Sequence, residues 1–149
     1  MALYSKTDAT LKNLKFQETD QGKWFTENAW KYGVIFRFPT LDFPGGEWED
    51  KTYKTGMSQT FKANIYRYVG KPHATAMRAM NMCLEEYVEY LISNPHLTVY
   101  RDGLLMYEIY RVSDTGESYM ELPKPNQAID YIASLDNMGG VVLAYTYNN

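Results

Sequence analysis

One stretch of the chain, residues 22–70, carries the strongest folding signals. Its first part has apolar side chains at helical spacing, namely Phe25, Ala29 and Tyr32. Residues at this spacing lie on one face of a helix, so we expect a buried stripe, with Trp24 beside it. The polar residues just before this run suit the N-terminal cap of a helix.

A glycine ends this predicted helix. Gly33 follows the last helical residue, where a glycine can take a positive φ without steric cost. Residues 34–38 then predict a short strand, which Pro39 ends because proline has no N–H for a sheet ladder. Residues 39–57 form a long loop, and residues 59–69 carry the branched and aromatic side chains of a second strand.

The remainder of the chain changes character near Pro95. Before it, residues 74–82 and 84–91 predict two helical segments, and the Asn-Pro pair at residues 94–95 stops the second. After it, short apolar runs alternate with turn residues, and the Asp-Gly pair at residues 102–103 is a strong hairpin signal. We expect five strands, at residues 97–100, 104–112, 119–122, 128–134 and 141–147.

These patterns predict an α+β fold in two parts. Residues 1–95 form helices packed on a small antiparallel sheet, and residues 96–149 form a small antiparallel β module. The chain has 149 residues, which is enough to bury a core without disulfides. Its single cysteine, Cys83, excludes an intrachain disulfide.

Composition and sequence patterns limit the kinds of partner and the location expected for this chain. A net charge of −3 gives no argument for nucleic acid. No apolar run approaches the roughly 18 residues of a membrane span. Residues 1–10 lack a basic start followed by an apolar run, so we expect no signal peptide and, for the chain as given, a cytoplasmic location. The 14 Tyr, 6 Phe and 3 Trp serve core packing or a peptide- or carbohydrate-binding surface.

Five short sequence motifs lie within residues 20–92, at residues 22–24, 27–33, 35–39, 66–71 and 84–87. In order and spacing they resemble the C-terminal half of the catalytic domain of VanY-type zinc D-alanyl-D-alanine carboxypeptidases. The resemblance implies a small α+β domain, truncated at its N-terminal side, whose antiparallel sheet lines a metal site.

The resemblance also implies where the chemistry would lie. The family's downstream motif, Glu-Pro-Trp-His, directly precedes Tyr-Arg-Tyr-Val-Gly and supplies the general base and a zinc-binding His. Here Lys62 stands at the place of the base and Ile65 at the place of the His. The family's upstream motif, with its His and Asp ligands, has no match. The resemblance therefore implies no catalytic residue and no zinc in this chain, although zinc is the cofactor of the family.

Three other residues could in principle bind a metal. His73, His96 and Cys83 have no ligand-like spacing, and a catalytic zinc needs three protein ligands. We expect His73 to be a surface residue at a helix start, His96 to be a linker residue and Cys83 to be a small buried side chain.

Binding residues are also suggested. Arg37 and Arg67 lie on predicted strands, where either could hold a peptide carboxylate in a bidentate pair or form a structural ion pair, which is the favoured reading. Tyr66 and Trp48 could add aromatic contacts.

Three functions fit the sequence. The first is a catalytically inactive carboxypeptidase-like protein that binds the peptidoglycan stem peptide or a protein partner. The second is an active zinc D-Ala-D-Ala carboxypeptidase that acts on peptidoglycan precursors. The third is a structural protein that forms a homodimer, since a missing upstream half would leave a sheet edge uncovered.

Overall fold

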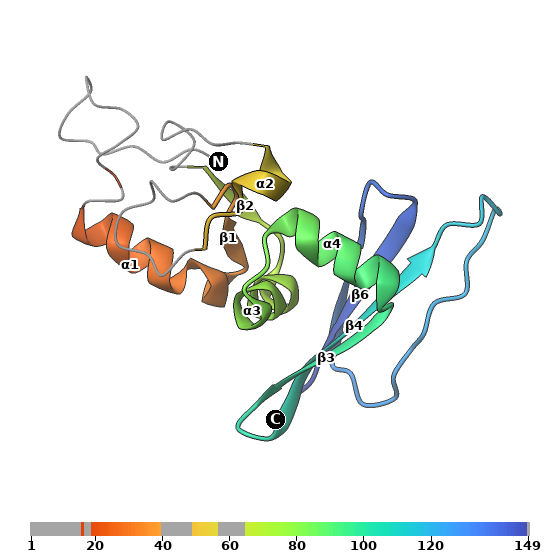
Figure 1. Ribbon diagram of the computed structural model, residues 1–149. Coiled ribbons are helices and arrows are strands. Elements are labelled where there is room, and N and C mark those ends of the chain that lie inside the picture. Colours follow the sequence, from red (N-terminus) through yellow and green to blue (C-terminus); the bar gives the residue numbers. More distant parts are fainter. Residues whose placement is uncertain (1–15, 17–18, 40–48, 57–64, 149) are drawn as a thin grey trace. The chain divides into compact units, whose positions relative to one another are not determined.

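The computed structural model describes residue 16 and residues 19–39, 49–56 and 65–148 (Figure 1). Lys62 and Trp48 lie outside these residues. The fold is α+β, as predicted, and it divides into two compact units, Met1–Glu86 and Tyr87–Asn149. The domain border predicted at residue 95 stays a prediction. Each unit is described by itself.

The first unit begins with α1 (Asp20–Asn28). Thr19 caps it, because its hydroxyl accepts a hydrogen bond from the Gly22 N–H at 3.0 Å. The chain then tightens into the 3-10 helix η1 (Ala29–Tyr32), and Gly33 ends it in the left-handed region at φ 83°. The predicted glycine stop is confirmed.

The buried stripe predicted for this helix is wrong in part. Ala29 is buried and Phe25 is half-buried, but Trp24 and Tyr32 are both exposed. The chain leaves α-helical geometry at Ala29, and the Tyr32 ring then lies against the Trp24 ring at a centroid distance of 6.1 Å. The two aromatic side chains therefore pair with each other on the surface.

A two-stranded antiparallel sheet forms the centre of the first unit. It pairs β1 (Val34–Phe36) with β2 (Tyr66–Tyr68), and Phe36 lies opposite Tyr66. Phe25 packs edge-on against Tyr66 at 4.8 Å, so aromatic rings from helix and sheet build the core. Within the described residues, both strands are shorter than the predicted ranges 34–38 and 59–69. Arg37 lies just beyond β1, which corrects its predicted place on a strand.

Three further helices belong to the unit or its border. The short α2 (Thr52–Thr55) lies within the segment predicted as loop. Then follow α3 (Lys71–Met80) and α4 (Leu84–Ser93), which confirm the two predicted helical segments. α4 spans the border between the two units.

The second unit contains a four-stranded antiparallel sheet. Its strands are β3 (His96–Arg101), β4 (Leu104–Ser113), β5 (Asp130–Leu135) and β6 (Gly140–Thr146), in the spatial order β3-β4-β6-β5. The predicted turn between β3 and β4 is confirmed, with residues 102 and 103 both at positive φ. Buried side chains on the two central strands form the core, including Ile109, Leu143 and Ala144.

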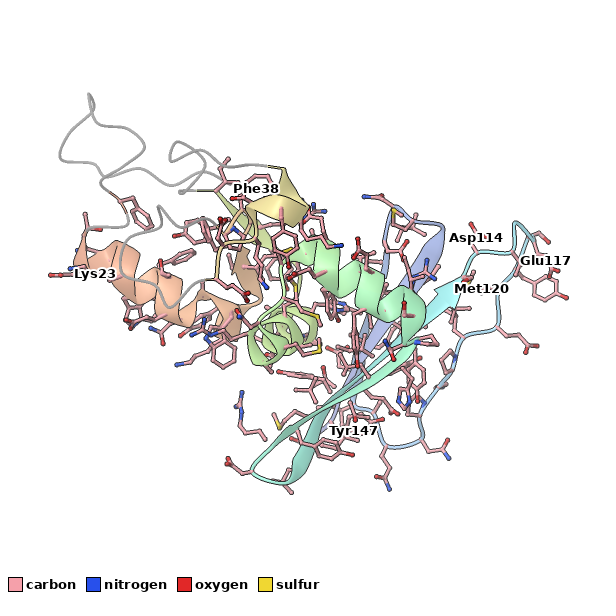
Figure 2. The ribbon with its side chains drawn as sticks, in the orientation of Figure 1. Lys23, Phe38, Asp114, Glu117, Met120 and Tyr147 are labelled. Atoms are coloured by element: carbon pink, nitrogen blue, oxygen red, sulfur yellow. The ribbon has the colours of Figure 1, made fainter. Side chains whose placement is uncertain are left out.

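The strand predicted at residues 119–122 does not form. Residues 114–129 have no regular structure, and Figure 2 labels Asp114, Glu117 and Met120 along this segment. The segment contains two prolines, at residues 123 and 125, which cannot donate to a ladder. It contacts the sheet through the Tyr145 hydroxyl, which donates a hydrogen bond to the Pro123 carbonyl.

Candidate functional site

Ile65, which the resemblance places where the family has its zinc-binding His, lies directly before β2. The Ile65 carbonyl accepts a hydrogen bond from the Arg37 N–H at 2.9 Å, which extends the β1–β2 pairing by one step. Arg67 lies opposite Ile35. Because side chains alternate along a strand, Ile65, Arg67, Ile35 and Arg37 share one face, while Tyr66 turns into the aromatic core. We call the first four the Ile65 face.

Arg37 is held by Glu85, in the first turn of α4. The two nitrogens of its guanidinium contact the two carboxylate oxygens at 3.1 and 2.5 Å, and its Cζ lies 4.5 Å from the centre of the Phe38 ring. Burial by itself would raise the pKa of Glu85, but the hydrogen bonds from Arg37 outweigh it and lower that pKa. The bidentate fork of Arg37 is thus occupied by a structural ion pair.

The next carboxylate, Glu86, is also occupied. It accepts hydrogen bonds from the Tyr53 hydroxyl and from the Cys83 N–H at 3.0 Å, and Lys51 lies 3.1 Å away. The same ammonium lies 3.0 Å from Glu49. Burial opposes ionisation of Glu86, yet these donors together lower its pKa. The contacts join the α2 segment to the first turn of α4.

These residues do not suit metal-assisted hydrolysis. A general base needs a free oxygen and a pKa near the working pH, whereas Glu85 and Glu86 have lowered pKa values and occupied oxygens. Ile65 has no donor atom for a metal. Among the described residues, no three His, Cys, Asp or Glu side chains gather closely enough to hold a metal ion. The described residues therefore do not fit the zinc of the family.

The suggested binding residues differ in accessibility. Arg67 is exposed on β2. Tyr66 is almost fully buried, its hydroxyl lies 3.3 Å from the Thr26 hydroxyl, and burial raises its pKa. Tyr66 can therefore support the sheet but cannot present its ring to a ligand in this conformation. Of the two candidate arginines, only Arg67 has an exposed side chain.

A small cavity is lined in part by Phe36 and Tyr66 of the aromatic core. It has a volume of about 30 Å³ and is lined by side chains of α1, η1, β1, β2 and α3, including Thr26, Trp30 and Met77. A volume of this size holds one or two water molecules. Ligand sites measure roughly 300–1,000 Å³, so this cavity cannot enclose a peptide.

Two predictions about histidine are wrong. His73 is buried within α3, and this burial lowers its pKa to about 4. Its spacing of four residues from buried Met77 was the available signal for a buried face. His96 is the first residue of β3, not a linker residue, and its Nε2 lies 2.7 Å from Glu108. Cys83 is buried as predicted, and burial raises its pKa to about 11.

The partners of Arg37 and Lys51 were missed by the sequence analysis. Arg37 and Glu85 are 48 positions apart, and Lys51 and Glu86 are 35 apart. Ion pairs within a helix can be expected from spacing of three or four residues. No comparable sequence signal exists for pairs over these separations.

The fold is shared with a solved structure. The chain is similar to the solved structure of VanXYg, a vancomycin-resistance D,D-dipeptidase in complex with a D-Ala-D-Ala phosphinate analogue, with a TM-score of 0.72. The superposition covers 95% of this chain and 53% of that chain, at 23% identity. At this identity the likeness shows the α+β fold alone.

Sequence relatives identify the family. The chain is 36% identical over 129 residues to a D-alanyl-D-alanine carboxypeptidase of Enterococcus faecium, and 38% identical over 66 residues to one of Enterococcus faecalis. These matches cover 87% and 44% of this chain. The chain belongs to the VanY-type D-alanyl-D-alanine carboxypeptidase family, as the sequence motifs predicted.

The match is partial in length. The chain spans 38% of the E. faecium protein and 20% of the E. faecalis protein. No family model matches the chain. No helix in the described part of the chain is both long enough and apolar enough to cross a membrane.

Proposed function

We propose that this chain is a catalytically inactive D-alanyl-D-alanine carboxypeptidase-like protein that binds a cell-wall stem peptide. The observation that carries the proposal is Ile65, an aliphatic residue where the resemblance places the family's zinc ligand, on a face whose Arg37 is bonded to the Glu85 carboxylate. Such a face keeps a scaffold for peptide but lacks the groups for hydrolysis.

Arg67 is the residue we assign to ligand binding. It shares the Ile65 face and is exposed, and its planar guanidinium can take a peptide C-terminal carboxylate in a bidentate pair. Arg37 has a structural role, because both guanidinium nitrogens bind the Glu85 carboxylate. This ion pair links the end of β1 to the first turn of α4. Trp48 stays a further candidate for contact with the peptide.

Titration calorimetry tests the binding. A peptide that ends in D-Ala-D-Ala with a free carboxylate is titrated to about 1 mM, where a weak site is still detected. We expect binding that weakens at least about tenfold in Arg67→Ala, a loss of roughly 1.4 kcal/mol. Arg101→Ala, at an exposed arginine of β3, is the matched control and should bind normally. No binding by the wild-type chain would overturn the proposal.

The alternative is an active zinc carboxypeptidase, which the family relationship favours. A test of D-alanine release from the same peptide, with zinc added, separates the two. One bound zinc per chain together with release of D-alanine would overturn the proposal of an inactive protein. The zinc ligands would then lie outside the described residues.

A further inference from the structure

The edge strand β5 differs from the other strands of its sheet in exposure. β5 pairs only with β6 among the described strands, and all six of its residues are exposed. Tyr131 and Leu135 keep 62% and 73% of their surface open to solvent. Two exposed apolar residues flank the strand, Ile129 and Met138.

Among the described residues, β5 lacks most of the usual protection of an edge strand. Natural edges are blunted by lysine, proline or bulges, because unpaired backbone groups recruit other strands. The sequence of β5, Asp-Tyr-Ile-Ala-Ser-Leu, contains no lysine and no proline. The opposite edge, β3, is interrupted by a bulge between Val99 and Tyr100 and ends in Arg101. Only β5 is left as a regular, apolar edge in the described sheet.

Hydrogen-bond directions along β5 follow from its pairing with β6. Asp136 N–H donates to the Gly140 carbonyl at 3.0 Å, in line with the register that pairs Ile132 with Ala144. Bonded pairs alternate in an antiparallel ladder, so the even-numbered residues of β5 bond to β6. The pairing of β6 with β4 leads to the same assignment. The Tyr147 N–H donates to the Met106 carbonyl in β4, so the odd-numbered residues of β6 bond to β4 and its even-numbered residues bond to β5.

Three residues of β5 therefore direct their backbone groups outward, Tyr131, Ala133 and Leu135. Within the described residues, the outward Tyr131 N–H donates to the Asp130 carboxylate at 2.8 Å. A backbone carbonyl of another strand can take the place of this carboxylate. The spacing of these groups is that of one half of an antiparallel ladder.

We infer that β5 pairs antiparallel with β5 of a second copy of this chain, about a two-fold axis at Ala133. In this register Ala133 faces its own equivalent, and each Tyr131 faces Leu135 of the other copy, an aromatic–aliphatic pair. A two-fold interface needs one surface that complements itself. The middle of β5 does so, with a small residue on the axis and a large apolar residue on either side.

Charge permits the same register. It places Asp130 across from Asp136 of the other copy, but Asp136 is not a bare charge. Its carboxylate lies 2.6 Å from Arg111 Nε and is only 2% exposed. The joined sheets would contain eight strands, twice the four of one copy, and would cover Tyr131 and Leu135 on both sides of the axis.

A proline scan tests the pairing. Sedimentation equilibrium on the full chain, at concentrations up to about 0.5 mM, should show a monomer–dimer equilibrium. Ala133→Pro removes only an outward N–H, so it should abolish the dimer and leave the melting temperature of the monomer nearly unchanged. Ser134→Pro removes an N–H bonded to β6, so it should lower the melting temperature.

A cysteine pair tests the register. Bonded partners in a ladder have Cα atoms about 5.5 Å apart, within the range of a disulfide. Ala133→Cys should cross-link quantitatively under mild oxidation, whereas Ser134→Cys, whose equivalents lie more than about 7 Å apart, should not. The native Cys83 is buried and should not react.

The outcomes separate this inference from the proposed function. A wild-type chain that is monomeric at every concentration, or a dimer that survives Ala133→Pro with the same dissociation constant, would overturn it. Equal cross-linking by the two cysteine variants would overturn the register. None of these results depends on peptide binding, which is tested at Arg67.

Discussion

The guanidinium of Arg111 lies directly against the backbone of Gly140. A Cβ atom at Gly140 would lie 2.5 Å from Arg111 Nη2, closer than real Cβ contacts allow. The guanidinium cannot easily move, because its Nε lies 2.6 Å from Asp136 and its Nη2 donates to the Met138 carbonyl at 3.2 Å. This contact holds the turn between β5 and β6.

We therefore expect Gly140→Ala to lower the free energy of unfolding by about 2 kcal/mol, through steric overlap and loss of the Asp136 ion pair. Urea denaturation measures it. The control is the double variant Gly140→Ala/Arg111→Ala, in which the overlap is relieved and the effects of the single variants should not add. Additive effects would contradict the contact.

The Arg37–Glu85 pair predicts a pH-dependent stability. Because the pKa of Glu85 is lowered below 4.5 in the folded chain, its contribution is present above that pH and is lost as pH falls through the folded value. Glu85→Gln should lower the free energy of unfolding by roughly 1–3 kcal/mol at pH 7 and by much less near pH 3. Chemical denaturation at the two pH values measures this difference.

Glu117→Gln is the matched control, because Glu117 is exposed in the irregular segment. It should leave the stability unchanged at both pH values. An equal loss in Glu85→Gln at pH 7 and pH 3 would show that the carboxylate charge does not stabilise the fold.

His73 predicts a loss of stability with falling pH that begins at a higher pH than that of Glu85. Burial lowers its pKa to about 4 from an ordinary 6.5, so the unfolded chain binds a proton between these values and the folded chain does not. Stability should fall by roughly 2–3 kcal/mol as pH falls from 6.5 to 4, and His73 should contribute no further loss below that.

Unfolding of His73→Gln across the same range measures this contribution as a flatter pH dependence. His96→Gln, at an exposed histidine, serves as the control. It should keep the wild-type pH dependence of the free energy of unfolding over this range. A His73 variant with the wild-type slope would contradict the prediction.

Gly33 should be intolerant of any side chain. It has a φ of +83°, and a Cβ there would lie 2.8 Å from the Gly70 carbonyl carbon and 2.9 Å from the Tyr68 ring. Gly33→Ala should therefore cost about 3 kcal/mol or more, from left-handed strain and overlap together.

Gly56 is its matched control. It has a similar φ of +66° with no atom near the Cβ position, so Gly56→Ala should cost only the backbone strain, about 1–2 kcal/mol. Thermal unfolding of both variants compares them, and equal losses would exclude a role for the close approach to Gly70.

Local features of this protein could be predicted from its sequence. The glycine stop at Gly33, the helical segments of α3 and α4 and the turn at residues 102–103 depend on side chains within a few positions of one another. The family could also be predicted, because its short motifs keep their order. The departure from the family motif at Ile65 stays a prediction from the sequence.

Other features depended on contacts between distant residues. The sequence assigned Tyr32 to a buried stripe and His73 to the surface, and both assignments were reversed by packing. It could not pair Arg37 with Glu85, nor show that residues 119–122 would find no strand partner. Helical periodicity and turn chemistry are properties of neighbouring residues, so the sequence determined the elements and the family. Burial, ion pairing and strand order depend on contacts between distant residues. Only the tertiary structure therefore decided which side chains are available to a ligand, and that β5 is an edge strand among the described residues.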